Sequence, residues 1–356
     1  MKPLTTVNLG KRSYPIFVER YALENLKEVI ERNIENVSSI ALLTDPIIYS
    51  LYGDKVLETV KSKNKILVPD GEEAKTWDTA SEIIGKLLDE NVDRKGLLIA
   101  LGGGAVGDVA GFVSSIYLRG IKVIQIPTTL LAMVDSSIGG KTAVNHPKGK
   151  NLIGSFHQPA AVVIDPNLLQ SLPLVEVTAG LGEIIKYGVI ADKDILDILE
   201  DSQEKIISSR SDKLSQLIGR CAVIKARYVE KDEHDILGIR ASLNYGHTLG
   251  HAVEKLSGIR HGEAVSIGME YAARIAVNRG LFKESEHHKQ RQICKNLELP
   301  VKLPKLNPKK ILKVMKKDKK AEQGKIRFVL PTGLGSEPVL EVVSENEIRK
   351  VLEEPP

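Results

Sequence analysis

The first half of the chain alternates short apolar runs with stretches of helical periodicity. These runs contain almost no polar residue, unlike strands that expose one face to water. Such strands are typical of parallel sheets that are buried on both faces, with helices in the connections. The pattern therefore predicts an α/β domain with a parallel sheet, and one of its helices is expected at about 76–89. The predicted strands are Ile40–Leu43, Lys65–Val68, Gly96–Leu101, Lys122–Ile126 and Ala161–Ile164.

From about Leu174 the pattern changes, and helical periodicity dominates to the end of the chain. A short apolar run at 325–330 predicts a strand, and Ser344 with Glu347 forms a capping box that predicts a last helix. We expect two domains, an α/β domain at 1–172 and a mostly α-helical domain at 173–356. The helices predicted in the second domain are 214–229, 248–256, 263–279, 285–297 and 308–317.

The composition excludes several classes of protein. A net charge of +4, from 50 basic and 46 acidic residues, is too small for an extended nucleic-acid surface. No uncharged apolar run approaches the roughly 18 residues of a membrane span, and Met1–Thr6 has no apolar signal core. Cys221 and Cys294 lie far apart and suggest no disulfide framework. His287 and His288 lie in a charged helix and are expected to be solvated. The expected partner is a small molecule in the cytoplasm, with no nucleic acid and no membrane.

A glycine-rich turn, Gly102–Asp108, follows one of the predicted strands. It satisfies the GxGxxG spacing, which offers backbone amides and a helix N-terminus to a phosphate group. The acid that usually binds the ribose about 20 residues later is missing, because 121–130 hold no carboxylate. Asp45, at the end of an earlier strand, is an alternative ribose-binding residue. Glu72 and Lys75 also follow the end of a strand.

The segment 126–151 places hydroxyl groups and lysines among glycines. Glycines let a backbone approach a ligand closely, and lysines pair with phosphate. Gly139–Thr142 resembles the end of a P-loop. Asp135 stands five residues before Gly140, where that motif has its first glycine, so we exclude a P-loop. The segment suits a phosphorylated substrate, with Arg119 just upstream.

His247, His251 and His261 lie close together among glycines, and Glu183 lies well upstream. Two separated imidazoles and a remote carboxylate can converge on one divalent metal and leave a position open, as in catalytic zinc sites. Because Thr248 follows His247, the HExxH motif is absent. The set predicts two histidine ligands and one proton-transfer group, and spacing leaves open which histidine is which.

Together these segments resemble the 3-dehydroquinate synthase family of sugar phosphate cyclases. The resemblance extends over nearly the whole chain. It implies a Rossmann-like nucleotide-binding α/β domain followed by a mostly helical metal-binding domain. The segments that carry it are Gly102–Asp108, Pro127–Lys141, Gly149–Gly154, Glu183–Lys186, Asn244–His251 and His261–Ala264.

The resemblance implies NAD and one divalent metal, Zn²⁺ or Co²⁺, as cofactors, and it implies a homodimer. By this resemblance Glu183, His247 and His261 are the metal ligands and His251 is an acid–base group. The implied reaction converts 3-deoxy-D-arabino-heptulosonate 7-phosphate to 3-dehydroquinate with loss of phosphate, and it regenerates NAD within each turnover. Such an enzyme is a phosphorus–oxygen lyase of the shikimate pathway.

The resemblance also assigns residues to cofactor and substrate. The implied NAD contacts are Asp45, Asp70, Gly71, Glu72, Glu73, Ala74, Lys75, Gly103, Gly104, Ala105, Val106, Gly107, Asp108, Thr128, Thr129, Lys141, Lys150, Leu168, Leu169, Gln170 and Ser171. The implied substrate contacts are Arg119, Asp135, Lys141, Asn151, Lys186, Lys225, Arg240, Asn244 and one of Lys319 and Lys320. Two alternatives stay open: an NAD(P)-dependent polyol or glycerol-phosphate dehydrogenase of the same fold, and a cyclase with another sugar phosphate substrate.

Overall fold

The structure is a computed structural model that describes residues 1–201, 206, 212–318 and 325–354. The chain forms two compact units, and one boundary between them lies between Leu172 and Pro173. The first unit contains Met1–Leu172 and Leu214–His234, and the second contains Pro173–Lys213 and Asp235–Pro356. Within the described part of the chain, no helix is long and apolar enough to cross a membrane.

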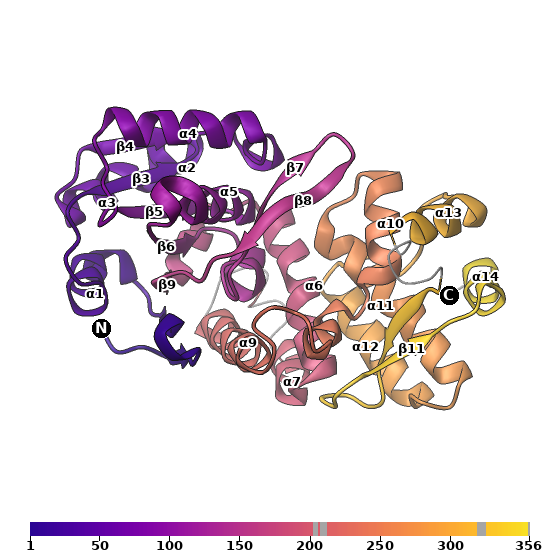
Figure 1. Cartoon of the computed structure of the whole chain (residues 1–356). Helices are drawn as coiled ribbons and strands as arrows, with labels where there is room; N and C mark the ends of the chain where they lie inside the picture. The colour runs from indigo at the N-terminus through magenta and orange to yellow at the C-terminus, as the bar shows by residue number, and fades with distance from the viewer. Residues whose placement is uncertain (202–205, 207–211, 319–324, 355–356) are drawn as a thin grey trace. The chain divides into compact units, whose positions relative to one another are not determined.

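A seven-stranded sheet forms the centre of the first unit, in the order β1-β2-β9-β6-β5-β3-β4. Figure 1 labels five of its strands, β9, β6, β5, β3 and β4. Every adjacent pair from β2 to β4 is parallel, whereas β1 pairs with β2 antiparallel. The predicted α/β domain with a parallel sheet is confirmed, and each predicted run forms a strand, while β1 and β2 were not predicted. The strands are β1 (Thr5–Val7), β2 (Tyr14–Val18), β3 (Ile40–Thr44), β4 (Asn64–Leu67), β5 (Leu97–Gly102), β6 (Lys122–Pro127) and β9 (Ala161–Ile164).

Helices α4 (Trp77–Asp89) and α5 (Gly104–Ile116) contribute to the core on one face of this sheet. Leu98 of β5 lies in that core. Ile99 points to the opposite face, because successive side chains of a strand alternate, and it is fully buried as well. Burial on both faces explains why the strands carry so few polar residues. The remaining α-helices before residue 173 are α1 (Leu26–Asn33), α2 (Pro46–Ile48) and α3 (Asp54–Val60).

A β-hairpin begins near the end of segment 126–151, which is rich in lysines and hydroxyl groups, and extends to Phe156. Its strands are β7 (Lys141–His146) and β8 (Gly149–Phe156), and β7 packs against α5. This approach requires Gly111 on α5, because a Cβ atom there would lie 2.3 Å from Cγ2 of Thr142. The lysines of this segment are therefore carried on a regular, packed element.

Helix α9 (Asp212–Lys231) packs with the first unit, although the sequence-based division at 172/173 assigns it to the second. Its Lys225 Nζ lies 2.7 Å from Asp135 Oδ1. Glu230, on the last turn, accepts hydrogen bonds of 2.7 Å from the backbone and side-chain nitrogens of Asn8. These contacts connect α9 to segments far upstream in the sequence, which helical periodicity does not reveal.

The second unit is mostly helical within its described part. Helices α10 and α11 pack against each other, and α11 also packs against α6 and α12 (Figure 1). The predicted capping box is present, because Ser344 and Glu347 cap the start of α14. The elements are α6 (Leu174–Ile190), α7 (Lys193–Asp201), α10 (His247–Ser257), α11 (His261–Asn278), α12 (Glu284–Asn296), α13 (Pro308–Asp318), α14 (Glu345–Glu353) and the antiparallel pair β10 (Arg327–Leu330) and β11 (Val339–Val342).

Candidate functional site

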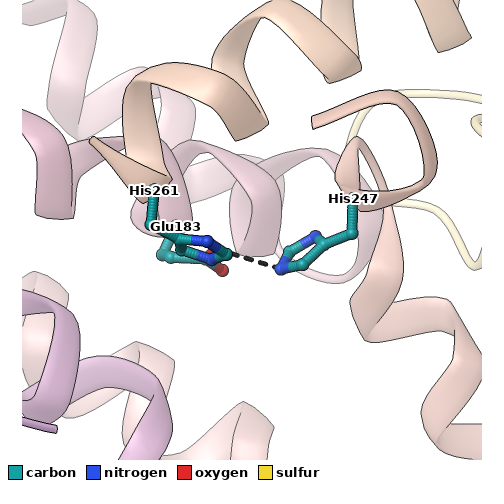
Figure 2. A group of neighbouring side chains, drawn as sticks. All are labelled: Glu183, His247 and His261. Atoms are coloured by element: carbon teal, nitrogen blue, oxygen red, sulfur yellow. Dashed lines mark ion pairs between the residues drawn. The ribbon is translucent and has the colours of Figure 1, made fainter. Parts of the chain in front are cut away.

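Three side chains from three helices of the second unit converge on one point. Glu183 lies on α6, His247 is the first residue of α10, and His261 is the first residue of α11. The potential ligand atoms of the three residues all lie within 4.8 Å of one another. Both histidine Nε2 atoms lie 3.3 Å from Glu183 Oε1, and Figure 2 shows the side chains pointing toward one another. The structure thus brings together the three predicted metal ligands.

Glycines next to these residues allow the helices to approach closely. A Cβ atom on Gly262, which follows His261, would lie 1.7 Å from the backbone oxygen of Ala179 on α6. A Cβ atom on Gly268 of α11 would lie 1.8 Å from the backbone oxygen of Gly246, the residue before His247. Any larger side chain at either position would push the backbones apart. The convergence of the three residues therefore depends on backbone contact between α11 and its two neighbours.

Glu183 is a buried carboxylate in a strongly cationic environment. Its side chain is 1% exposed and forms an ion pair with the equally buried Lys186 one turn away. Burial alone would raise the pKa of Glu183, but Lys186 and then His247 outweigh burial and hold that pKa well below its usual value. Neither carboxylate oxygen accepts a hydrogen bond of good geometry. An ionised carboxylate with free acceptor positions beside two imidazole nitrogens fits a divalent cation such as Zn²⁺.

The second ring nitrogen of each histidine, Nδ1, also lies beside a hydrogen-bond acceptor. His261 Nδ1 lies 2.9 Å from Glu254 Oε2, and His247 Nδ1 lies 3.1 Å from the backbone oxygen of Tyr245. Burial lowers the pKa of His261, but Glu183 and Glu254 more than compensate and raise that pKa to about 10. Acceptors at Nδ1 orient both rings so that each Nε2 faces Glu183, as expected of two metal ligands. Glu254 was not predicted from the sequence, although it lies two helical turns beyond His247 on the same face of α10.

His251 lies beside this group but is not one of the converging residues. It follows His247 by one turn of α10, is exposed, and has its ring centroid 5.3 Å from that of His247 and 5.9 Å from that of His261. Glu183, His247 and His261 thus converge on one point, and His251 is an exposed imidazole next to them. This arrangement is compatible with the predicted acid–base role of His251.

His287 is buried, so the prediction that it is solvated was wrong. Its Nε2 atom lies 3.0 Å from Oε2 of Glu270, a residue of α11 that is 1% exposed and also pairs with Arg291. His287 lies on the face of α12 that packs against α11, as Gln290 and Cys294 do, whereas the neighbouring His288 is exposed. The many charged residues of α12 led to the wrong prediction, because they do not reveal that one face of the helix is buried.

In the first unit, the order of the strands creates a switch point between β3 and β5. The chain continues from β3 to β4 on one side and then returns to β5 on the other side of β3. In parallel sheets, ligands bind outside the carboxyl ends of the strands at such a point. Asp45 follows β3 directly and Gly103 follows β5 directly. The two predicted NAD-binding segments therefore flank the position where a nucleotide is expected.

Both segments offer groups that could bind a nucleotide. Gly103 is the N-cap of α5 and supplies no capping side chain, so the first amides of this helix are available to an anion. A Cβ atom on Gly104 would lie 2.9 Å from Ser136 Oγ, which explains the need for glycine. Asp45 Oδ1 accepts a hydrogen bond of 2.9 Å from the backbone nitrogen of Ile48. Burial, assisted by the charge of Asp70, raises the pKa of Asp45.

Lys75, a predicted NAD contact, binds both another predicted NAD contact and a predicted substrate contact. Its Nζ atom lies 2.7 Å from Asp108 Oδ2 and 2.7 Å from Asn151 Oδ1, and only 4% of the residue is exposed. Burial raises the pKa of Asp108, and the adjacent Lys75 opposes that rise. Asn151 adopts a left-handed backbone conformation with φ of 56° on β8. The hairpin thus brings a predicted substrate residue to two predicted NAD residues.

Arg119 is not brought to this edge of the sheet. It lies just before Lys122, which pairs with Leu97 at the amino end of β5, whereas Gly102 pairs with Pro127 at the carboxyl end. Helix α5 connects the two edges, and Arg119 follows its C-terminus. The contact between Arg119 and substrate stays a prediction.

The other predicted residues occupy several elements. Thr128 and Thr129 follow β6, and Leu168–Ser171 lie in and just after the 3-10 helix Pro166–Gln170 that follows β9. In the second unit, Arg240 is buried and Asn244 exposed on the 3-10 helix Ile239–Asn244. Lys141 and Lys150 are exposed on the hairpin, the turn Asp70–Ala74 follows β4, and Lys319 and Lys320 lie outside the described residues.

Comparisons with known proteins agree with these features. Two family models match consecutive parts of the chain: 3-dehydroquinate synthase N-terminal at residues 65–179 and 3-dehydroquinate synthase C-terminal at residues 180–321. A 3-dehydroquinate synthase from Thermodesulfovibrio yellowstonii is 46% identical over 356 residues, covering 98% of this chain and 99% of the relative.

Two solved structures of sugar cyclases are similar over nearly their whole length. A 2-epi-5-epi-valiolone synthase from Streptomyces hygroscopicus, with NAD⁺ and Zn²⁺ bound, has a TM-score of 0.86 and 28% identity, covering 97% of each chain. A 2-deoxy-scyllo-inosose synthase, complexed with carbaglucose-6-phosphate, NAD⁺ and Co²⁺, has a TM-score of 0.87 and 28% identity, covering 99% of each chain. The family models favour the cyclase assignment over the dehydrogenase alternative. The chain belongs to the 3-dehydroquinate synthase family.

Proposed function

We propose that this chain converts 3-deoxy-D-arabino-heptulosonate 7-phosphate to 3-dehydroquinate and phosphate, with NAD and one divalent metal. Family membership supports the reaction, and the cofactors bound in the two similar cyclase structures support the cofactor requirement. The observation that carries the proposal is the convergence of Glu183, His247 and His261 on one point. We also propose, on the resemblance alone, that the chain acts as a cytoplasmic homodimer.

The metal would be held by three side chains of the second unit. Glu183, His247 and His261 offer one oxygen and two nitrogens, the donor set of many catalytic zinc sites with an open position. When bound, a divalent metal would act as a Lewis acid toward the substrate oxygens at C4 and C5. Lys186 would keep Glu183 ionised, because its ammonium group is buried against that carboxylate.

His251 would transfer the proton of the C5 hydroxyl, directly or through a water molecule. Its exposed ring lies next to the rings of both histidine ligands, which supports a role in proton transfer close to the metal-binding groups. General acid–base catalysis by a positioned histidine typically contributes 10²–10⁴-fold to a rate. His251 would therefore affect turnover far more than metal content.

The first unit would bind NAD at the switch point of its sheet. The amides that open α5 at Gly103 would receive the pyrophosphate, and the Asp45 carboxylate would accept hydrogen bonds from ribose hydroxyls. When bound, NAD would take a hydride from C5 and return it later in the same turnover. Lys225, which pairs with Asp135, would contribute positive charge for the anionic substrate.

The test is a turnover assay with the purified chain. The phosphorylated heptulosonate is supplied in excess over NAD, with Zn²⁺ or Co²⁺, and phosphate release is followed over time. We expect phosphate to exceed NAD by many turnovers, with no net accumulation of NADH. Stoichiometric NADH would identify a dehydrogenase. Phosphate release only from a different sugar phosphate would identify another cyclase, and both outcomes would overturn the proposal.

An Asp45→Ala variant separates cofactor binding from the rest of the reaction. Loss of hydrogen bonds to a charged group costs about 1.5–3 kcal/mol, so the NAD concentration needed for half-maximal rate should rise by roughly 10–100-fold. Asp54→Ala, which removes a carboxylate from the N-terminus of α3, is the control. Equal responses of the two variants would contradict the assignment of Asp45.

A further inference from the structure

Glu254 and Glu183 lie on opposite sides of the His261 ring. Glu183 Oε1 is 3.3 Å from Nε2, and Glu254 Oε2 is 2.9 Å from Nδ1. Glu254 is on α10 and His261 opens α11, so the hydrogen bond also joins two helices that carry metal-binding histidines. Each nitrogen of the His261 ring therefore lies close to a carboxylate, and the two carboxylates come from different helices.

The two histidines differ in the acceptor at their outer nitrogen. His247 Nδ1 faces the neutral backbone oxygen of Tyr245 at 3.1 Å, whereas His261 Nδ1 faces a carboxylate. A hydrogen bond to a charged acceptor is shorter and roughly twice as strong as one to a neutral acceptor. The His261 ring should therefore have the more strongly fixed orientation of the two.

Arg260, the residue next to His261, contacts two other carboxylates. It donates from Nε to Glu176 Oε1 at 2.7 Å and lies 3.9 Å from Glu263. The side chain of Glu254 is 21% exposed and that of His261 is 30% exposed, so their hydrogen bond is partly shielded from water. Partial shielding strengthens a charge-assisted hydrogen bond compared with one at a fully exposed surface.

We propose that Glu254 is a positioning residue for the metal site. This inference rests on the proposed function, because it assumes that Glu183, His247 and His261 bind a divalent metal. Glu254 accepts the Nδ1 proton of His261, which keeps a proton on that nitrogen and directs Nε2 toward the point that His261 shares with Glu183 and His247. Partners of this kind also make a histidine a stronger ligand, and their loss typically weakens metal affinity by about 10–100-fold.

The experiment measures Zn²⁺ affinity of the full chain by competition with a chromophoric chelator. Glu254→Gln keeps the size of the side chain and removes its charge, so we expect Zn²⁺ to bind about 10–100-fold more weakly than to the unsubstituted chain. The matched control is Glu176→Gln, which removes another carboxylate of the second unit that contacts Arg260. We expect its affinity to stay within about twofold of the unsubstituted chain, since Glu176 contacts no metal-binding residue that we identify.

A second readout distinguishes positioning from general stabilisation. In the proton spectrum of the zinc-loaded chain, the His261 Nδ1 proton should appear as a slowly exchanging downfield resonance. That resonance should be lost in Glu254→Ala and kept in Glu176→Gln. Far-ultraviolet circular dichroism checks folding, and if the alanine variant unfolds, the isosteric glutamine variant decides.

The outcomes are separable. Zn²⁺ affinity of Glu254→Gln within twofold of the unsubstituted chain, or an equal loss in Glu176→Gln, would overturn the role of Glu254 while leaving the metal site intact. Failure of the unsubstituted chain to bind Zn²⁺ stoichiometrically would remove the proposed metal site itself, and the role of Glu254 with it.

Discussion

Metal binding should displace a proton from His261, and the displacement should persist well above neutral pH. Glu183 and Glu254 overcome the effect of burial and raise the pKa of this imidazole from 6.5 to about 10. A metal binds only the neutral ring, so it must remove the proton. At pH 8 the protonated fraction is about 0.99 for a pKa of about 10, compared with about 0.03 for the usual value. The expected release from His261 is therefore about one proton for each metal bound.

The assay is isothermal titration calorimetry of the chelator-treated chain with Zn²⁺ at pH 8. Runs in buffers of different ionisation enthalpy give the number of protons released as the slope of the observed enthalpy. The same chemistry predicts that Zn²⁺ affinity rises about tenfold for each pH unit between pH 7 and 9. Glu254→Gln removes one of the groups that raise the pKa of His261, so it should reduce the number of protons released at pH 8.

A water molecule on the metal can also lose a proton, so one further measurement decides the origin. Titration of the His261 ring in the metal-free chain by nuclear magnetic resonance gives its pKa directly, with a His261→Gln variant to assign the signal. A ring that is already neutral at pH 8 would refute the reasoning, whatever the calorimetric slope. A slope near zero at pH 8 would refute it as well.

Four further predictions concern the same unit and one control helix. Glu183→Gln should weaken Zn²⁺ binding by about 100-fold or more, because it removes the only anionic ligand of the proposed set; a metal-replete variant in elemental analysis would contradict this. His251→Ala should keep full metal content and lower turnover by about 10²-fold or more, and loss of zinc would instead make His251 a ligand. Gly262→Ala should destabilise the chain by about 1–3 kcal/mol, because its Cβ would lie 1.7 Å from a backbone oxygen of α6. Gly85→Ala on α4, where the new Cβ would meet no neighbouring atom within 4 Å, should instead stabilise the chain by up to about 1 kcal/mol. Denaturant unfolding that finds the Gly262 variant the more stable of the two would disprove this. The pKa of His261 is raised from 6.5 to about 10 in the folded chain, so its ion pairs contribute stability that is complete below pH 6.5 and is lost as pH rises through 10. The Tm of the metal-free chain should therefore fall between pH 7 and 10. A Tm that does not change over this range would count against the raised pKa.

The central sheet was predictable because its strands are buried on both faces. Runs such as 97–102 need no knowledge of their partners to be recognised, since almost every residue is apolar. The hairpin of β7 and β8 was missed for the opposite reason. β8 has no fully buried residue, so it lacks the apolar signal, and its pairing with β7 depends on contacts with α5.

The candidate site was only partly predictable from the residues themselves. The spacing of His247, His251 and His261 indicated a metal, but the choice of ligands required the positions of three helices. Glu183 could be named from the sequence only as a remote carboxylate, and its assignment as a ligand came from the resemblance, because the two histidines lie far along the chain. Glu254 was missed because its role follows from one hydrogen bond across a helix–helix turn.

The charges of the second unit would allow the proposed metal site to fold before a metal binds. Glu183 is 1% exposed, and a buried carboxylate without compensation is costly. Lys186 provides that compensation through an ion pair, and the raised pKa of His261 favours a second positive charge beside the carboxylate in the metal-free chain. A divalent metal would then replace the proton on His261 while Lys186 remains, so the carboxylate is never left without a positive partner. Because the backbone contacts around Gly262 already fix the helices, metal binding should change protonation at the site more than its geometry.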